Sequence, residues 1–528
     1  MGLHPAGRVA DYTARGWWRA DTIDSLLRAR TAERPDRPAI VDAPNKPAFS
    51  DLPVRRLTFA ELDAEVNRIA AALQRHAIQP GDVVGLQMPN SVELVASLLA
   101  VIRIGAVASP LPVQYREHEL SLLPKLADFK AIVTAFPERL GGHEMTVLGF
   151  GEVPEGVVAL DNEPPAEPEP HPLDPNDCVT ICWTSGTEST PKGVPRTHYD
   201  WLAIAEPCAK APELTADDVL LNPFPVINMA ALGGTVIPWL RTGCVFALHH
   251  PFDLPTFLGQ LASERVTYTL APPALLTMLL HNEKLMSTVD ISSVRAIGSG
   301  SAPLPEAMVR GWQERHGIAI INFFGSNEGV ALLSAPAQFP DPELRARYFP
   351  RRGFPGTSLK LADAAGKEIT EPGVPGELRI KGPTVFAGYL PGTGGDPFDA
   401  DGYFSTGDVF EIAGDDGQYL RYVDRAKDII IRGGMNIAPA ELENLLQSHP
   451  SVADVAVIGV PDPVLGERTC AVVVAAPGTE PTADELLEYL RGRRIASFKL
   501  PERFEFTDAL PRNPVGKILK RELRQALA

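Results

Sequence analysis

The chain has 528 residues, more than one hydrophobic core usually holds, so we expect at least two domains. Hydrophobic residues make up 45% and charged residues 22%, as in globular proteins that dissolve in water. The formal net charge of −17 argues against nucleic acid or an anionic membrane surface as the main partner.

The five cysteines, at positions 178, 182, 208, 244 and 470, form no C-x-x-C pair. An odd number without a framework predicts reduced thiols and a cytoplasmic protein. The start of the chain carries no long apolar run, which predicts that there is no secretory signal. No apolar run is long enough to span a membrane, so we expect no integral membrane association.

The first 150 residues alternate between helical and strand patterns. Helices are expected over 22–34, 58–76 and 91–104, and strands over 38–41, 83–88, 106–112 and 131–134. This alternation predicts parallel strands joined by crossover helices, and such sheets bind ligands at the carboxyl ends of their strands. A stretch rich in proline and glutamate, 151–176, is typical of a surface linker.

The next stretch, Thr184 to Gly193, holds five hydroxyl side chains, two glycines and Lys192 within ten residues. Hydroxyls and backbone N–H groups can surround a phosphate, glycines let the backbone approach it, and a lysine supplies positive charge. The order differs from the Walker pattern, because Lys192 is preceded by proline and followed by glycine. A polar turn between two strands is the alternative interpretation.

The alternation then resumes. Strands are expected over 219–221, 245–248, 267–270, 294–297 and 318–324, and helices over 228–241, 254–265 and 273–281. The strand that begins with 294–297 ends in the small residues Gly298 to Ser301, against which a flat ligand can lie, although a strand-to-helix turn has the same composition. His249 and His250 follow another strand, and we expect them on the surface rather than at a metal.

The strand 318–324 runs into the polar residues Gly325 to Gly329. A carboxylate at a strand end, here Glu328, can hold a Mg²⁺ ion that also contacts a phosphate. Phe324 can offer its face to a base. A plain polar loop is the alternative interpretation.

Glycine, proline and short β-type runs mark residues 340–400, which predicts a small β-barrel or distorted sheet. Asp408 follows a tight glycine turn and can accept hydrogen bonds from two ribose hydroxyls, although a turn aspartate is common by itself. Residues from 439 onward predict a separate α+β unit of about 100 residues. Lys517 lies in a Pro/Gly loop of this unit, where a lysine considered alone is most often a surface residue.

In their order along the chain, five motifs together resemble the adenylate-forming superfamily. That superfamily contains acyl- and aryl-CoA ligases, adenylation domains of peptide synthetases, and luciferases. The motifs are the run 184–193, Phe-Gly-x-x-Glu at 324–328, Thr-Gly-Asp at 406–408, Arg-x-Lys-Asp with Gly-Gly-x-Asn at 425–436, and Gly-Lys at 516–517. The resemblance extends from about Asp21 to Leu527.

The resemblance implies an α/β fold in two parts. A large N-terminal domain of mixed and parallel sheets with crossover helices, 1–424, would include a small β-barrel-like subdomain at about 340–424. A hinge at 425–427 would precede a small, mobile α+β C-terminal domain, 428–528. The protein would be a monomer or a homodimer.

The resemblance also implies a two-step reaction of a small carboxylic acid. The acid attacks the α-phosphate of Mg-ATP, giving an acyl-adenylate and pyrophosphate, and the thiol of coenzyme A then displaces AMP. Loading of an aryl acid onto the phosphopantetheine of a carrier protein uses the same motifs, so this alternative stays open. A plain P-loop NTPase would need the Walker pattern that the chain lacks.

The implied site residues follow the motif positions. Lys517 would bridge the carboxylate and the α-phosphate, Glu328 would bind Mg²⁺, and Lys192 would act at the β- and γ-phosphates. The residues expected to bind ATP or AMP are Thr184, Ser185, Gly186, Thr187, Ser189, Lys192, Ser301, Ala302, Pro303, Asn322, Phe324, Gly325, Asn327, Asp408, Arg425 and Lys517. Within this set, Phe324 would stack on adenine, and Asp408 and Arg425 would hold the ribose.

Further positions match the hinge, the thiol tunnel and the acyl pocket of the superfamily. Lys427 would be the hinge residue, and Gly433 and Gly434 would line the tunnel for the pantetheine of coenzyme A. The expected acyl-pocket residues are Asn228, Met229, Gly233 and Gly298. The small residues among them predict room for a bulky or cyclic acyl group.

Three positions depart from the superfamily pattern. Phe324 replaces the usual tyrosine, keeping the stacking face without the hydroxyl, and Asn327 replaces a threonine but can still donate a hydrogen bond. Asn228 stands where members that activate aryl acids tend to have histidine. The identity of the acid is therefore not predicted.

Overall fold

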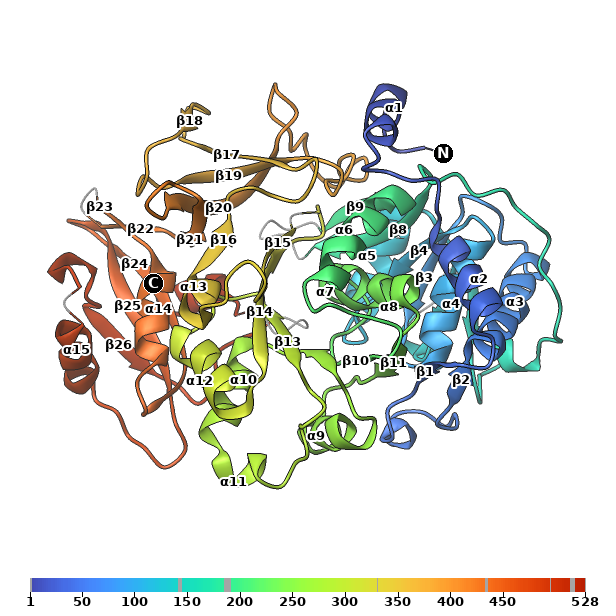
Figure 1. Cartoon of the computed structure of the whole chain (residues 1–528), viewed down its shortest axis with the longest axis horizontal. Coiled ribbons are helices and arrows are strands. Elements are labelled where there is room, and N and C mark those ends of the chain that lie inside the picture. Colours follow the sequence, from blue (N-terminus) through green and yellow to red (C-terminus); the bar gives the residue numbers. More distant parts are fainter. Residues whose placement is uncertain are drawn as a thin grey trace.

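The protein is described by a computed structural model over residues 2–140, 145–184, 191–329, 331–432, 435–493, 495–512 and 518–527. Two sheets fill much of its N-terminal part (Figure 1). The described part of the first has the strand order β7-β6-β5-β3-β4-β8-β9, from β3 (Val83–Gln87), β4 (Val107–Pro110), β5 (Phe129–Thr134), β6 (Thr146–Gly149), β7 (Val158–Ala159), β8 (Cys178–Thr184) and β9 (Lys192–Thr197).

The second sheet has eight strands within the described residues. Its order is β15-β14-β13-β12-β10-β11-β1-β2, from β1 (Pro38–Val41), β2 (Arg56–Thr58), β10 (Val219–Asn222), β11 (Val245–Leu248), β12 (Tyr268–Leu270), β13 (Ala296–Gly300), β14 (Ala319–Gly325) and β15 (Ala331–Ser334). Neighbouring strands in both sheets are parallel except at the pairs β8/β9, β1/β2 and β14/β15. The predicted architecture of parallel strands and crossover helices is confirmed.

Helices form layers between and outside the two sheets. Their bounds are α1 (Ala6–Ala14), α2 (Ile23–Glu33), α3 (Phe59–Arg75), α4 (Val92–Arg103), α5 (Glu117–Ala127), α6 (His198–Lys210), α7 (Met229–Ala231), α8 (Ile237–Thr242), α9 (Leu254–Ser263), α10 (Pro273–His281), α11 (Glu283–Met286), α12 (Glu306–His316) and α13 (Pro342–Arg347). Helices α2, α3, α4, α6 and α8 share one core with both sheets, so they lie between them. Helix α5 covers the outer face of the first sheet.

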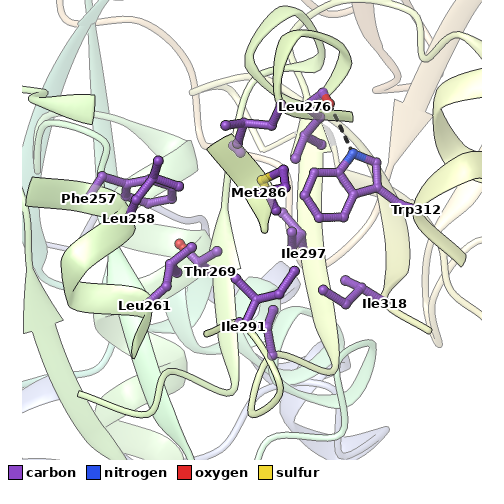
Figure 2. Close-up of a pocket in the computed structure, with 13 residues that line it drawn as sticks. Phe257, Leu258, Leu261, Thr269, Leu276, Met286, Ile291, Ile297, Trp312 and Ile318 are labelled. Atoms are coloured by element: carbon purple, nitrogen blue, oxygen red, sulfur yellow. Dashed lines mark hydrogen bonds between the residues drawn. The ribbon is translucent and has the colours of Figure 1, made fainter. Parts of the chain in front are cut away.

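Helices α9, α10 and α12 pack on the other face of the second sheet. An apolar cavity lies within this layer (Figure 2). The indole of Trp312 donates a hydrogen bond to Leu276 O at 3.0 Å, and the Thr269 hydroxyl donates to Leu221 O at 2.9 Å. The polar groups at its wall are thus occupied, and the cavity is a gap in core packing rather than one of the predicted sites.

A third sheet corresponds to the β-rich stretch of the sequence. Its order is β16-β21-β20-β19-β17-β18, from β16 (Tyr348–Pro350), β17 (Ser358–Ala362), β18 (Glu368–Ile369), β19 (Gly376–Lys381), β20 (Phe404–Ala413) and β21 (Tyr419–Arg425). The neighbouring strands are antiparallel, and the sheet has its own core.

The C-terminal part is a small α+β domain around a fourth sheet (Figure 1). The sheet is built from β22 (Ile430–Arg432), β23 (Met435–Ile437), β24 (Val452–Asp462), β25 (Gly466–Ala475) and β26 (Arg503–Phe506). Helices α14 (Pro439–Gln447) and α15 (Ala483–Gly492) share one core with this sheet, and α16 (Lys520–Leu527) shares another. The two-part α/β fold implied by the sequence is confirmed.

Two predicted elements differ from the structure. The helix expected over 228–241 is divided into α7, a π-helical turn (η4, Leu232–Val236) and α8. The strand expected from Val294 to the small residues at 298–301 is β13, Ala296–Gly300, which begins two residues later than predicted and includes Gly298 and Gly300. Their parallel pairing with β12 and β14 extends the strand through these small residues.

All five cysteines are free thiols, as expected, and burial raises the pKa of Cys182 and Cys208 to about 12. Within the described ranges, no helix combines the length and the apolar character needed to cross a membrane.

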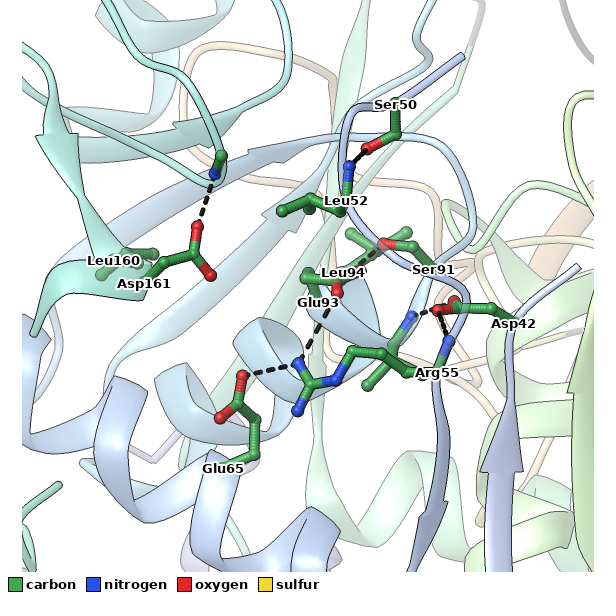
Figure 3. A network of polar contacts seen from close by, with 12 residues as sticks. Asp42, Ser50, Leu52, Arg55, Glu65, Ser91, Glu93, Leu94, Leu160 and Asp161 are labelled. Atoms are coloured by element: carbon green, nitrogen blue, oxygen red, sulfur yellow. Dashed lines mark hydrogen bonds and ion pairs between the residues drawn. The ribbon is translucent and has the colours of Figure 1, made fainter. Parts of the chain in front are cut away.

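Charged residues are buried where α4 passes between the sheets. Every residue of α4 is buried, including Glu93. Lys46 Nζ lies 2.8 Å from Glu93 Oε2 and 2.7 Å from Asp42 Oδ2, and all three side chains are at most 1% exposed. Arg55 lies between Glu65, at 2.9 Å, and Glu93, at 3.6 Å (Figure 3). Burial, and next the nearby Glu93 carboxylate, raise the pKa of Asp42.

Replacing Lys46 by methionine should destabilise this part of the molecule strongly, because two carboxylates would remain buried without their cation. The expected loss is about 3–5 kcal/mol in the free energy of unfolding of the unit that contains α4, measured by urea denaturation. The control is Arg37→Met, which removes an exposed ion pair with Asp217 and should cost less than about 1 kcal/mol. Equal losses in the two variants would contradict the prediction.

Candidate active site

The carboxyl ends of strands from both large sheets meet. Asn90 follows β3 of the first sheet, and its Nδ2 donates to Phe224 O at 2.8 Å in the segment after β10 of the second. Its Oδ1 accepts a hydrogen bond from Val226 N at 3.1 Å. The ligand-binding edges of two parallel sheets are therefore held together by a buried amide.

The predicted phosphate loop joins two strands of a hairpin. Thr184 at the end of β8 pairs with Lys192 at the start of β9. Gly193 N donates to Thr393 Oγ1 at 3.0 Å, and Leu390 N donates to Gly193 O at 2.8 Å, so the segment 389–393 packs against the hairpin. Ser185, Gly186, Thr187 and Ser189, predicted to bind phosphate, lie outside the described residues.

Lys192 and Glu328, which come from different motifs, meet at Tyr389. The Lys192 ammonium lies 5.1 Å from the centroid of the Tyr389 ring, and the Tyr389 hydroxyl donates to Glu328 Oε1 at 3.0 Å. Burial and the Glu328 carboxylate raise the pKa of Tyr389, which keeps its hydroxyl protonated as a donor. Tyr389 is not among the residues predicted from the sequence, because no spacing relates it to either motif.

The donor set at Glu328 fits a hard cation such as Mg²⁺. Carboxylate oxygen is a preferred ligand of this ion, which usually keeps water and substrate phosphates as its other ligands. Across the described parts of the chain, no three His, Cys, Asp or Glu side chains form a metal cluster. A cation at Glu328 would need further oxygen ligands, which substrate phosphates and water can supply.

The predicted adenine and ribose residues lie beside each other. Phe324, at the end of β14, packs with Phe410 at 5.0 Å and Tyr422 at 5.8 Å between ring centroids. Asp408 on β20 and Arg425 on β21 pair in register, and Arg425 Nε lies 3.1 Å from Asp408 Oδ1. The third sheet thus brings the two motifs together, since Tyr422 and Arg425 belong to the same strand.

The other predicted nucleotide residues surround the end of β13 and β14. Asn322 is buried, and its Nδ2 donates to Ala346 O at 2.8 Å. Gly325, Ser301 and Ala302 are exposed, and Pro303 is half-buried. Ser301 has a φ of 68°, so the chain turns sharply where it leaves β13.

The predicted acyl-pocket residues are close together but tightly packed. Asn228 caps α7 by accepting a hydrogen bond from Ala230 N at 3.1 Å, and Asn327 Oδ1 accepts one from Met229 N at 2.8 Å. A Cβ atom on Gly233 would lie 2.7 Å from Met229 Sδ, and one on Gly298 would lie 2.6 Å from the Tyr268 hydroxyl. Neighbouring side chains thus occupy the space beside these two glycines, and the acyl-pocket role of the four residues stays a prediction.

The expectation that His249 and His250 lie on the surface is also wrong. They are 0% and 6% exposed. His249 Nδ1 lies 2.7 Å from Gln260 Oε1, and its Nε2 accepts a hydrogen bond from Asp253 N at 3.0 Å. Burial lowers the pKa of His250 to about 4. The strand before them, β11, is central in its sheet, so its end is covered on both sides.

A buried carboxylate joins the two sides of the predicted hinge. Asp424 precedes Lys427, which is exposed, and Asp424 Oδ2 accepts a hydrogen bond from Ala440 N at 2.8 Å in the first turn of α14. Burial raises the pKa of Asp424 to about 6, although the Lys520 charge lowers it. Gly433, Gly434 and Lys517 lie outside the described residues.

The chain belongs to the family of AMP-binding enzymes, which residues 27–390 match, and residues 441–517 match the AMP-binding enzyme C-terminal domain. It is thus an adenylate-forming enzyme. A feruloyl-CoA synthase of an Amycolatopsis species is 36% identical over 89% of this chain and 94% of its own length. Pyochelin synthase PchD of Pseudomonas aeruginosa strain UCBPP-PA14 is 31% identical over 99% of this chain and 95% of its own.

A solved structure shares the fold. An anthranilate CoA ligase in complex with anthranoyl-AMP superposes with a TM-score of 0.85 over 96% of this chain and 97% of the ligase, at 22% identity.

Replacing Asp424 by asparagine should change stability in a pH-dependent way. The folded protein holds the Asp424 proton up to about pH 6, whereas the unfolded chain releases it near the usual value of 3.8. The folded state binds more protons in this window, so the stability contribution of Asp424 falls as the pH rises through it. The melting temperature of Asp424→Asn relative to wild type should therefore increase from pH 4 to pH 6, by the equivalent of about 2 kcal/mol.

Asp428→Asn is the control for this experiment. Arg524 lies 2.8 Å from Asp428, and the net pKa of Asp428 is lowered despite burial. Its stability contribution is lost as the pH falls, so this variant should show no such increase. The same trend in both variants would contradict a raised pKa at Asp424.

Proposed function

We propose that the chain is an AMP-forming ligase that activates a small carboxylic acid with Mg-ATP and transfers the acyl group to the thiol of coenzyme A. The observation that supports this most is the meeting of Lys192 and Glu328 at Tyr389. The Lys192 ammonium and the Glu328 carboxylate, a type of ligand that Mg²⁺ prefers, both contact the side chain of Tyr389. Such groups stabilise the charge that develops on the departing pyrophosphate.

In the first step, a carboxylate oxygen of the acid bonds to the α-phosphorus while the bond to pyrophosphate breaks. Glu328 would hold a Mg²⁺ ion, which would neutralise charge at the phosphates. Asp408 and Arg425 would bind the ribose hydroxyls, and Phe324 would present its face to adenine. Lys517 would orient the attacking carboxylate against the α-phosphate, a role that rests on its motif position alone.

In the second step, the sulfur of the thiol bonds to the acyl carbon, and AMP leaves with the oxygen that joined it to the acyl group. The names feruloyl-CoA synthase and anthranilate CoA ligase favour coenzyme A as acceptor and an aryl acid as substrate. ATP and coenzyme A are both cytoplasmic metabolites, which fits a cytoplasmic location of the protein.

The second candidate is a ligase that loads the acid onto the phosphopantetheine of a carrier protein. Pyochelin synthase PchD matches 99% of this chain. Its name does not mention coenzyme A, which favours this alternative. Pyrophosphate exchange over a panel of aryl and cyclic acids should first identify the acid. Incubation of that acid with ATP and either coenzyme A or a holo carrier protein then separates the two candidates. A thioester that forms on the carrier protein alone would reject the proposal.

Replacing Lys517 by alanine should abolish acid-dependent pyrophosphate exchange, because the proposed role of its ammonium is to orient the acid against the α-phosphate. Thioester formation from a supplied acyl-adenylate should stay within about threefold of wild type, since that step needs no such contact. Lys499→Ala is the control, because Lys499 pairs with Glu441 within the C-terminal domain. Equal loss of both half-reactions in Lys517→Ala would contradict this role.

A further inference from the structure

Resting on the proposed function, we propose that Arg196 is a positioning residue for Glu328 and that the N-terminal segment, residues 2–22, holds Arg196 in place. Arg196 lies on β9, four residues after Lys192, and its side chain is 0% exposed. Its Nη1 donates to Asn327 O at 3.0 Å, and its Nη2 donates to Thr384 O at 2.9 Å. One planar guanidinium therefore joins the residue before Glu328 to a segment of the third-sheet region.

The backbone around Glu328 is held at several points. Phe386 N donates to Glu328 O at 3.0 Å. Gly329 has a φ of 100°, and a Cβ atom there would lie 1.8 Å from Thr384 O and 2.6 Å from Arg196 Nη1. Only glycine fits this position, so Arg196 and the segment 384–386 enclose the loop that carries Glu328.

A buried arginine in this position requires compensation. Removing a cation from water costs several kcal/mol, as a general magnitude. Its nearest carboxylate, on Asp200, is 3.8 Å from Nε. Burial is the main influence on the pKa of Arg196 and lowers it, while the Asp200 and Glu328 charges oppose this shift. The hydrogen bonds to Asn327 O and Thr384 O are thus the direct contacts that offset burial, one on the Glu328 loop and the other on the segment that packs against it.

Asp200 connects Arg196 to the N-terminal segment. Its Oδ2 accepts a hydrogen bond from Thr197 N at 2.9 Å at the start of α6, and its Oδ1 lies 3.0 Å from His4 Nε2. Although burial raises the pKa of Asp200, His4 and Arg196 lower it to about 2, which keeps the carboxylate ionised. Both the His4 and the Asp200 side chains are 0% exposed.

The N-terminal segment also contacts the segment 382–385 directly. Arg8 Nη2 donates to Gly382 O at 2.9 Å and to Val385 O at 2.7 Å, and Trp18 Nε1 donates to Pro383 O at 3.0 Å. Trp18 stacks on Tyr199 of α6, with ring centroids 4.6 Å apart. The N-terminal segment therefore contacts both Asp200 and the segment 382–385, whose Thr384 carbonyl binds Arg196. Through these contacts the first residues of the chain would contribute to ATP binding.

Arg196→Lys tests the inference, because lysine keeps the charge but lacks the planar fork that joins the two carbonyls. Calorimetric titration should give a Kd for Mg-ATP raised about tenfold, and a Kd for ATP in EDTA within about twofold of wild type. Acid-dependent pyrophosphate exchange should fall about tenfold or more, while thioester formation from a supplied acyl-adenylate stays within about threefold. A purely structural defect would affect both titrations and both half-reactions alike.

The matched control is Arg103→Lys. Arg103 is also buried and pairs with Asp24 at 2.7 Å, but it lies on α4. Arg103→Lys should leave the ratio of the Kd for Mg-ATP to the Kd for ATP in EDTA as it is in wild type. The inference would be overturned if Arg103→Lys raised the Kd for Mg-ATP without raising the Kd for ATP in EDTA, or if Arg196→Lys had a normal Kd for Mg-ATP.

His4→Gln and Arg8→Gln probe the N-terminal segment and remain informative if Arg196→Lys does not fold. Each should raise the Kd for Mg-ATP about two- to fivefold and leave the Kd in EDTA unchanged. No change in either variant would overturn the role of the segment. The titrations need no turnover, so they judge this inference even if no acid supports pyrophosphate exchange, a result that would reject the proposed function instead.

Discussion

Parallel strand pairing is the constraint on which the rest of the structure depends. It places the carboxyl ends of β10, β12, β13 and β14 at one edge of their sheet, because each crossover helix returns the chain to the opposite edge. The first sheet obeys the same rule, and Asn90 joins the two edges. Motifs far apart in the sequence therefore reach one region because each follows the end of a strand.

Single polar side chains, Arg196 buried and Tyr389 and Asn327 half-buried, then set the geometry of that region. Tyr389 connects the phosphate hairpin to Glu328, and Arg196 connects the residue before Glu328 to Thr384. Asn327 connects the same loop to Met229 at the start of α7. In a buried site each donor has few alternative partners, so losing one leaves an unsatisfied group and shifts the segment that it held.

Local patterns predicted much of the fold and little of the packing at the site. Helices α3 and α4 follow from hydrophobic periodicity and capping residues, and α10 follows from an apolar run that starts at a proline; these signals depend only on neighbouring residues. The same reasoning missed the π-helical turn within 228–241 and the burial of His249 and His250. Both depend on what other segments pack against them, and periodicity carries no information about those segments.

By itself the sequence determined the family and the type of chemistry. The motif at 184–193, Glu328 and Asp408 carry residue types whose chemistry is local, namely hydroxyls, a lysine and carboxylates in a fixed order. Only the tertiary structure decided that Lys192 and Glu328 share Tyr389, that the space beside Gly233 and Gly298 is filled, and that His4 reaches Asp200. These contacts join residues up to about 200 positions apart, and distances of that kind are fixed by how the sheets pack rather than by spacing along the chain.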